Sequence, residues 1–259
     1  MLKAVKVRIY PTDEQSITLA KHFGCTRWLW NHCLSVMTET YKTTGKGISA
    51  FNMKKQIPIL KAEHEWLKEC YSQCLQQSVL NLSQAFQNFF EGRAKYPNFK
   101  SKHYRQSVQF PQNVKVISES AIKFPGLLGT VTAKIHRPIE GTIKTVTVSR
   151  NPDGKYFASL LVDDGIEKPE SSSEGKAIGI DLGLTDFAIT SDGSKFANPR
   201  HLKKHERNLK RKQRKLSRRE KGSKNRNKAR LKVAKVHSKI ARVREDFHHK
   251  LSRKIVNEN

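Results

Sequence analysis

The chain has 259 residues, of which 50 are Lys or Arg and 23 are Asp or Glu, so its formal net charge is +27. Such an excess of cations makes a polyanion, either nucleic acid or an anionic membrane surface, the first partner to consider. With 36% hydrophobic residues, a mean hydropathy of −0.66 and no apolar run of the roughly 18 residues that span a bilayer, the composition argues against a membrane protein.

The N-terminal residues do not form a secretory signal. They alternate charged residues with Val and Ile, whereas a signal has a basic segment followed by an apolar one. We therefore expect a cytoplasmic protein. The four cysteines, at positions 25, 33, 70 and 74, are too few for a disulfide scaffold and contain no CxxC pair. They are predicted to be reduced thiols of the core, and no zinc site is expected.

The last quarter of the chain carries most of the charge. Residues 197–259 contain 24 Lys and Arg against 5 Asp and Glu. Two dense clusters, at residues 210–219 and 221–232, would repel themselves unless phosphate groups neutralise them, so we expect them to contact nucleic acid. A solvated basic helix face or a flexible tail is the alternative explanation.

Residues 2–10 alternate apolar and charged side chains, which predicts a half-buried strand that ends at Pro11. Thr12 is the expected cap of a following helix. From there to about residue 93, apolar residues recur at three- and four-residue steps, which predicts helices. The clearest one covers residues 72–90, where an apolar stripe lies opposite a face rich in glutamine.

That polar face includes Gln73, Gln76 and Gln77. An amide side chain can form two hydrogen bonds with adenine, so these residues could read base edges. An ordinary polar helix face is the simpler explanation, and without further context it is the favoured one.

From residue 96 to about residue 161 the apolar period changes to two, and Pro, Gly and Asn separate short segments. Strands are predicted at residues 114–116, 121–124, 130–135, 143–148 and 156–162. Such a series is typical of a small β-barrel. Because the first strand would otherwise stand alone, we expect it to join this barrel, with residues 11–95 as a helical insertion. Residues 167–176 predict a linker into a further domain.

Residues 177–196 predict a β-hairpin with an acid in its first strand. Asp181 has apolar neighbours there, and a carboxylate is costly to bury unless it is paired or binds a cation, so Asp181 is a candidate functional residue. Asp186 would point to the opposite face and Asp192 belongs to the turn, so neither is placed to share a metal ion with it. Two helices joined around residues 222–223 are expected to follow.

Four short motifs in the chain resemble those of the TnpB family, whose transposase OrfB-like members are encoded by bacterial insertion sequences. In chain order they are Gly24-Cys25-Thr26-Arg27 with Asn31 and Leu34, Tyr96-Pro97-Asn98-Phe99-Lys100-Ser101-Lys102 leading to Gln106-Ser107-Val108, Gly179-Ile180-Asp181-Leu182-Gly183-Leu184, and Asp246-Phe247-His248-His249-Lys250-Leu251-Ser252. Each motif alone is weak, but four in the right order make the resemblance specific, and it covers the whole chain.

The resemblance implies an α+β multidomain fold. A small wedge-type β-barrel (residues 1–10 and 96–166) would carry an inserted helical recognition domain (residues 11–95). Residues 177–259 would then form the first part of a RuvC-type α/β nuclease domain of the RNase H-like fold, including a basic helical hairpin.

The resemblance also implies an RNA-guided DNA endonuclease, associated with a transposable element, that cuts DNA with three acids around Mg²⁺ or another divalent metal ion. Asp181 matches the first acid. The second and third acids and a zinc-binding insertion would fall after Asn259, so we expect a C-terminally truncated fragment or a cleavage-inactive copy that binds no metal firmly. A nuclease-inactive RNA- and DNA-binding regulator of transposition or transcription is the alternative, and a generic basic or ribosome-associated protein is a third.

The partners implied are a guide RNA and double-stranded DNA with a target-adjacent motif. The three glutamines named above would lie near that DNA. Lys100, Lys102 and Arg105 would contact the RNA backbone. Arg27 and Asn31 lie four residues apart on one helical face. We consider a structural role and a contact with phosphate equally for these two residues.

The two basic clusters would lie along the guide–target duplex, where they would hold its phosphates without reading sequence. The residues expected to do so are Lys210, Arg211, Lys212, Arg214, Lys215, Arg218, Arg219, Lys224, Arg226, Lys228 and Arg230.

Overall fold

The computed structural model describes residues 1–167 and 177–258. The chain divides into two compact units. The first consists of Met1–Asn151 with Lys155–Glu167, and the second of Pro152–Gly154 with Lys168–Asn259. From residue 168 on, the predicted linker lies outside the described residues.

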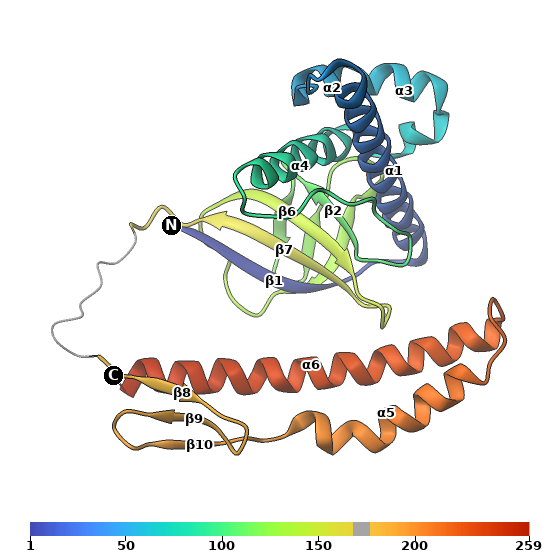
Figure 1. Ribbon diagram of the computed structural model, residues 1–259. Helices are drawn as coiled ribbons and strands as arrows, with labels where there is room; N and C mark the ends of the chain where they lie inside the picture. The colour runs from blue at the N-terminus through green and yellow to red at the C-terminus, as the bar shows by residue number, and fades with distance from the viewer. Residues whose placement is uncertain (168–176, 259) are drawn as a thin grey trace. The chain divides into compact units, whose positions relative to one another are not determined.

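Unit 1 is built on a seven-stranded antiparallel sheet with the order β2-β6-β7-β1-β5-β4-β3. In Figure 1, β1 lies next to β7, and β6 follows on the other side of β7. Its strands are β1 (Leu2–Tyr10), β2 (Gln106–Phe110), β3 (Lys115–Ser118), β4 (Ala121–Lys123), β5 (Thr130–Lys134), β6 (Thr142–Arg150) and β7 (Tyr156–Asp163). Strands β2 and β3 are the two ends of this order. The protein is thus a mixed α and β protein with a large antiparallel sheet, and the wedge-type barrel stays a prediction.

Strand β1 lies between β7 and β5, although the helices separate it from them in the sequence. It pairs with β7 from Leu2 to Ile9 and with β5 from Arg8 to Tyr10. The expected pairing of the first strand with the later strands is therefore confirmed. The alternation of apolar and charged residues along β1 reflects a half-buried strand, as predicted. Val7 and Ile9 are buried in the core, whereas Lys6 is exposed.

The strand β2 was not predicted. It pairs with β6 over its whole length, and Val108 and Phe110 are its buried side chains. Its five residues contain only two apolar side chains, and this pattern is too short to predict a strand from the sequence.

The helical segment between β1 and β2 contains α1 (Asp13–Thr44), α2 (Ala50–Lys55), α3 (Ile57–Glu63), the 3₁₀ helix η1 (Glu65–Glu69) and α4 (Ser72–Phe90). Thr12 caps α1, as predicted, since its hydroxyl accepts from the N–H of Gln15 while the Gln15 side chain accepts from the N–H of Thr12. Gly45 ends α1 with a φ of 68°, a left-handed conformation that glycine adopts readily. The predicted bounds of α4 are confirmed.

The helices and the sheet share one hydrophobic core. Leu19 of α1, Leu75 of α4, Phe110 of β2 and Val146 of β6 are all fully buried in it. A further 3₁₀ helix, η2 (Gly126–Leu128), precedes β5.

All four cysteines are free and buried, as predicted. Burial raises the pKa of the Cys33 thiol to about 12, so this thiol stays protonated at neutral pH.

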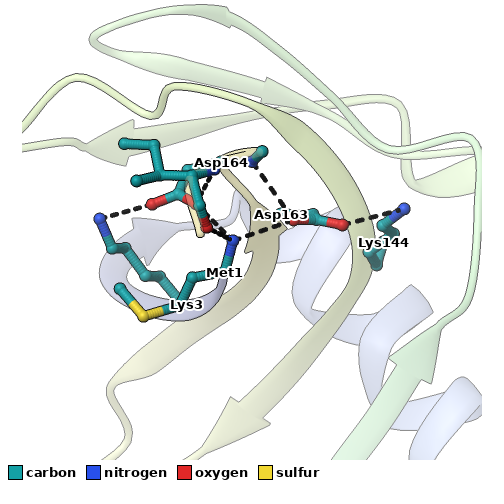
Figure 2. A network of polar contacts seen from close by, with 7 residues as sticks. Met1, Lys3, Lys144, Asp163 and Asp164 are labelled. Carbon is teal, nitrogen blue, oxygen red and sulfur yellow. Dashed lines mark hydrogen bonds and ion pairs between the residues drawn. The ribbon is translucent and has the colours of Figure 1, made fainter. Parts of the chain in front are cut away.

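Ion pairs connect the N-terminal end of β1 to the C-terminal end of β7 (Figure 2). The amino group of Met1 donates to Asp164 at 2.7 Å and to Asp163 at 3.4 Å. Lys3 also pairs with Asp164, and Lys144 of β6 pairs with Asp163. Hydrogen bonds from Lys3 and the chain's amino group lower the pKa of Asp164. The first strand is thereby held by charge as well as by its backbone pairing.

Unit 2 contains a three-stranded antiparallel sheet of β8 (Ile180–Leu182), β9 (Asp186–Thr190) and β10 (Lys195–Ala197). Two helices follow, α5 (His201–Ser217) and α6 (Lys224–Glu258), joined around Gly222 as predicted. None of the helices in the described part of the chain has the length and apolar character needed to cross a bilayer.

Candidate nucleic-acid interface

Helices α5 and α6 pack through a narrow apolar seam. Leu209 of α5 is buried against Val233, Val236 and Ile240 of α6, and Leu216 packs beside them. On α6, the apolar residues Val236, Ile240 and Leu251 are buried. Because the seam is narrow, most of the surface of both helices is left to charged side chains.

Most of the predicted phosphate-binding residues are exposed on this helical pair. Those with exposed side chains are Lys210, Arg211, Arg214, Lys215, Arg218, Arg219, Lys224, Lys228 and Arg230, and Lys212 is half-buried. Few acids offset them locally, although Glu206 pairs with Lys210 at 2.7 Å. The geometry gives a dense cationic surface, which binds phosphates of any sequence.

A surface hollow of about 300 Å³ lies between the two helices. It is lined by four cations, Arg211, Lys212, Lys215 and Lys232, and by Ala229. A phosphate group placed there would have donors from both helices within reach. Lys232 is the last residue of the second basic cluster and was not among the individually predicted phosphate contacts.

Arg226 differs from its basic neighbours. Its guanidinium Nη1 donates to the carbonyl oxygens of Leu216 at 3.2 Å and Arg219 at 2.7 Å. The Leu216 carbonyl belongs to the last turn of α5 and the Arg219 carbonyl follows the helix, where carbonyl oxygens no longer have the full set of N–H partners found inside a helix. Arg226 therefore caps α5, a structural use that the sequence pattern did not indicate.

Asp181 lies on β8 and pairs with Ile189 of β9. The expectation that it is buried is wrong, because every residue of β8 is exposed. The buried residues of this hairpin, Ala188 and Thr190, both belong to β9. Because an exposed carboxylate has no burial cost, the burial argument for a functional role of Asp181 no longer holds. Only the family motif still supports that role.

The described residues contain no group of three or more His, Cys, Asp or Glu side chains that could hold a metal ion. Asp192 is engaged in its turn, where it accepts from Thr190 and from the N–H of Ser194. A centre with two divalent ions needs several carboxylate oxygens. The residues described here therefore do not fit such a centre by themselves.

Gln73, Gln76 and Gln77 of α4 are half-buried, and Gln77 belongs to a row of amide side chains. Gln77 donates to Asn81, and Asn81 donates to Gln109 of β2. Gln109 in turn donates to Thr145 of β6. The row connects the helix to the sheet, so Gln77 has a structural role beside any contact with bases. No hydrogen bond is recorded for Gln73 or Gln76 within the described residues.

Arg27 and Asn31 both hold the segment that enters β2. Arg27 Nη1 donates to Oε1 of Gln106 at 3.0 Å. Asn31 forms two hydrogen bonds with the backbone of Lys100. For Asn31 the structural role accounts for both polar atoms of the side chain.

Lys100, Lys102 and Arg105 are exposed on this segment. The ammonium group of Lys100 lies 3.5 Å from the centre of the Trp30 ring, a cation–π contact. Burial of the ammonium against the protein lowers the pKa of Lys100 to about 8, even though much of its side chain remains exposed.

An exposed cationic helical pair and a basic loop beside a row of amides are typical of nucleic-acid-binding proteins. Two family models match the chain: residues 153–259 match one described as "Probable transposase", and residues 1–46 match one described as "Helix-turn-helix domain", both of the OrfB type of insertion-sequence protein. Residues 1–46 and 153–259 thus carry the two domains of this type of transposase.

Two curated relatives agree with this assignment. A protein of Streptomyces pristinaespiralis named "Putative RNA-guided DNA endonuclease" is 38% identical over 99% of this chain and 65% of its own length. A protein of Escherichia coli (strain K12) named "Putative RNA-guided DNA endonuclease InsQ" is 32% identical over 80% of this chain and 51% of its own length. The chain thus spans between half and two thirds of the length of these relatives.

Among solved structures, one titled "Cryo-EM structure of CRISPR-Cas12f Ternary Complex" covers 95% of this chain and 61% of its own, with 13% identity and a TM-score of 0.42. A likeness at that level carries no argument about function.

Proposed function

We propose that the protein is a relative of the TnpB-type RNA-guided DNA endonucleases associated with transposable elements, and that it binds a guide RNA and double-stranded DNA beside a target-adjacent motif. The observation that carries the proposal is the exposed cationic surface of α5 and α6. The names of the two relatives, at 38% and 32% identity, support the choice of activity.

The cationic surface suits a guide–target duplex because every phosphate is an equivalent ligand. Arg and Lys side chains from two packed helices can follow a backbone without reading bases. The hollow around Ala229 offers a place where one phosphate would meet four cations. Sequence would then be read by pairing between guide and target, and the protein would supply affinity.

In this proposal unit 1 contacts the guide RNA and the motif beside the target. Residues 11–95 would serve as the recognition domain, and Gln73 and Gln76 of α4 would be the amides free to meet a base. Residues 1–10 and 96–166 would be the wedge domain, and residues 177–259 the first part of a RuvC-type domain. The protein would work in the bacterial cytoplasm, on the nucleoid when bound to DNA.

Asp181 would be one carboxylate of a divalent-metal site in this family. When bound, such ions polarise the scissile phosphate and activate water. Because the described residues do not fit a complete centre, we assign no hydrolytic step to them. The 259-residue chain alone is expected to hold nucleic acid without cutting it.

The test is a binding and cleavage assay with a guide RNA recovered from the host and a DNA duplex that matches it. The proposal predicts guide-dependent binding of the matching duplex in preference to a mismatched one. Binding without cleavage in Mg²⁺ would fit the expectation for these residues, and would direct the next test to the regulation of transposition or transcription.

A control variant, Asp181→Asn, should bind as the wild type does, because Asp181 is not one of the cations of the surface on α5 and α6. Equal affinity for matched and mismatched duplexes at all salt concentrations would contradict the proposal. Mg²⁺-dependent cleavage that Asp181→Asn abolishes would show that the chain's own residues complete the metal site.

A further inference from the structure

The segment between α4 and β2, residues 91–105, has neither helix nor strand but is rich in cations. It contains Arg93, Lys95, Lys100, Lys102 and Arg105, against the single acid Glu91. Arg93 pairs with Glu91. The part of the segment nearer β2 therefore has positive charge without a local acid.

Side chains from neighbouring elements hold this segment in one conformation. The indole N–H of Trp30 donates to the carbonyl oxygen of Asn98 at 3.1 Å. Asn31 binds the backbone of Lys100, and Gln106 donates to the carbonyl oxygens of Lys102 and Tyr104 at 2.9 and 3.0 Å. An ordered loop presents its side chains at a lower entropic cost than a flexible one.

Two aromatic rings of this segment are exposed. The exposed fraction is 64% for Phe99 and 76% for Tyr104. Tyr96, in contrast, packs edge-on against Phe86 and Phe89 and donates or accepts a hydrogen bond with Thr38. Within the described residues, the rings of Phe99 and Tyr104 make no contact with another aromatic ring. Their exposed ring faces can therefore meet a ligand.

We propose that Phe99 and Tyr104 form a stacking site for unpaired bases of a single-stranded nucleic acid, with Lys102 and Arg105 beside its phosphates. Alternation of aromatic and cationic side chains on an ordered segment is the arrangement that binds single strands, because every base has a face to stack and every phosphate a charge. The charge favours a nucleic acid over an apolar protein surface. The inference rests on the proposed function and adds a site and a ligand class to it.

The experiment compares two oligonucleotides of 20 nucleotides, oligo(dT) and an abasic chain with the same phosphates. Their affinity ratio reports base stacking and cancels the binding of phosphates by α5 and α6. We expect the wild type to prefer oligo(dT) by about 5- to 50-fold, given the usual contribution of a stacked base. In Phe99→Ala with Tyr104→Ala, the preference should fall at least about fivefold. Oligo(U) RNA, run in parallel, shows whether the site distinguishes RNA from DNA.

Phe51→Ala is the matched control, since Phe51 is an aromatic residue of α2 with an exposed fraction of 62% and lies outside the basic segment. It should keep the wild-type ratio. Phe99→Leu with Tyr104→Leu keeps apolar bulk and should also lose the preference if stacking is the cause.

An unchanged ratio in both double variants would overturn the inference, as would a wild-type ratio near one. Neither result would affect the proposed function if the matching duplex still binds with its guide. Failure of the wild type to bind any nucleic acid would instead refute the proposed function itself.

Discussion

The side-chain amide of Asn31 forms reciprocal hydrogen bonds with the backbone of Lys100. Its Nδ2 donates to the Lys100 carbonyl oxygen at 3.0 Å, and its Oδ1 accepts from the Lys100 N–H at 2.7 Å. A residue on α1 therefore fixes a loop 69 positions further along the chain. This contact sets the position of the basic loop between α4 and β2, on which the proposed base-stacking site depends.

Replacing Asn31 should loosen that loop. Asn31→Ala removes both hydrogen bonds and should lower the free energy of unfolding by about 1–3 kcal/mol. Asn31→Asp keeps the acceptor but loses the donor, so its loss should be smaller. Urea unfolding measures the stability, and faster hydrogen exchange at the Lys100 amide would identify the loop as the part affected. Wild-type exchange in Asn31→Ala would contradict the role assigned here.

The stability of unit 1 should fall in mild acid because of His22. This residue is buried, its Nδ1 donates to the carbonyl oxygen of Thr18, and its Nε2 accepts from the N–H of Tyr71. Burial lowers the pKa of His22 below its ordinary value of 6.5. The unfolded chain thus binds the proton more readily, and stability is lost as pH falls from about 6.5 through the lower folded pKa.

The measurement is the urea midpoint of unfolding between pH 7.5 and pH 5. His22→Gln has no ionisable group at this position and should show a smaller decrease over the same range. The difference between the two curves isolates His22 from the other histidines. Parallel curves would contradict the prediction.

The sequence pattern predicted much of this fold because regular elements have periodic apolar residues. Residues 72–90 carry a helical stripe and form α4 as expected, and Thr12 caps α1 as expected. The sequence pattern did not predict properties that depend on the tertiary surroundings of a residue. Asp181 has apolar neighbours in the sequence, yet every residue of β8 is exposed among the residues that the structure describes, and only tertiary structure could show this. The capping role of Arg226 could not be recognised within a run of identical charges.

Lys100 should lose its charge at an unusually low pH. Its pKa of about 8 predicts a lysine ammonium that titrates well below the ordinary value of 10.5. The folded state then releases this proton before the unfolded state does, so the contribution of Lys100 to stability increases as pH rises from 8 to 10.5. NMR of isotope-labelled lysine side chains should show one Nζ signal with a midpoint near pH 8 that is absent in Lys100→Arg. A wild-type spectrum without it would contradict the assignment.

The basic residues of the helical pair should separate into two functional groups. Arg214→Gln and Arg230→Gln remove exposed charges and should each reduce the slope of log affinity against log salt by about 0.9 on duplex DNA, if each contacts one phosphate. Arg226→Lys keeps the charge but loses the cap, so it should lower the free energy of unfolding by about 1 kcal/mol and leave the slope unchanged. Fluorescence anisotropy at several salt concentrations and thermal unfolding provide the two readouts. A reduced slope in Arg226→Lys would show that its charge contacts phosphate after all.

The central claim, that the chain holds a specific guide RNA, is tested most directly by purifying the protein from its host and sequencing the RNA bound to it. The account predicts one discrete RNA species, enriched far above its cellular abundance. It also predicts that this RNA is released when Arg214 and Arg230 are replaced together by Gln. A bound population that merely mirrors the abundance of cellular RNAs would contradict the account and indicate a generic basic nucleic-acid-binding protein.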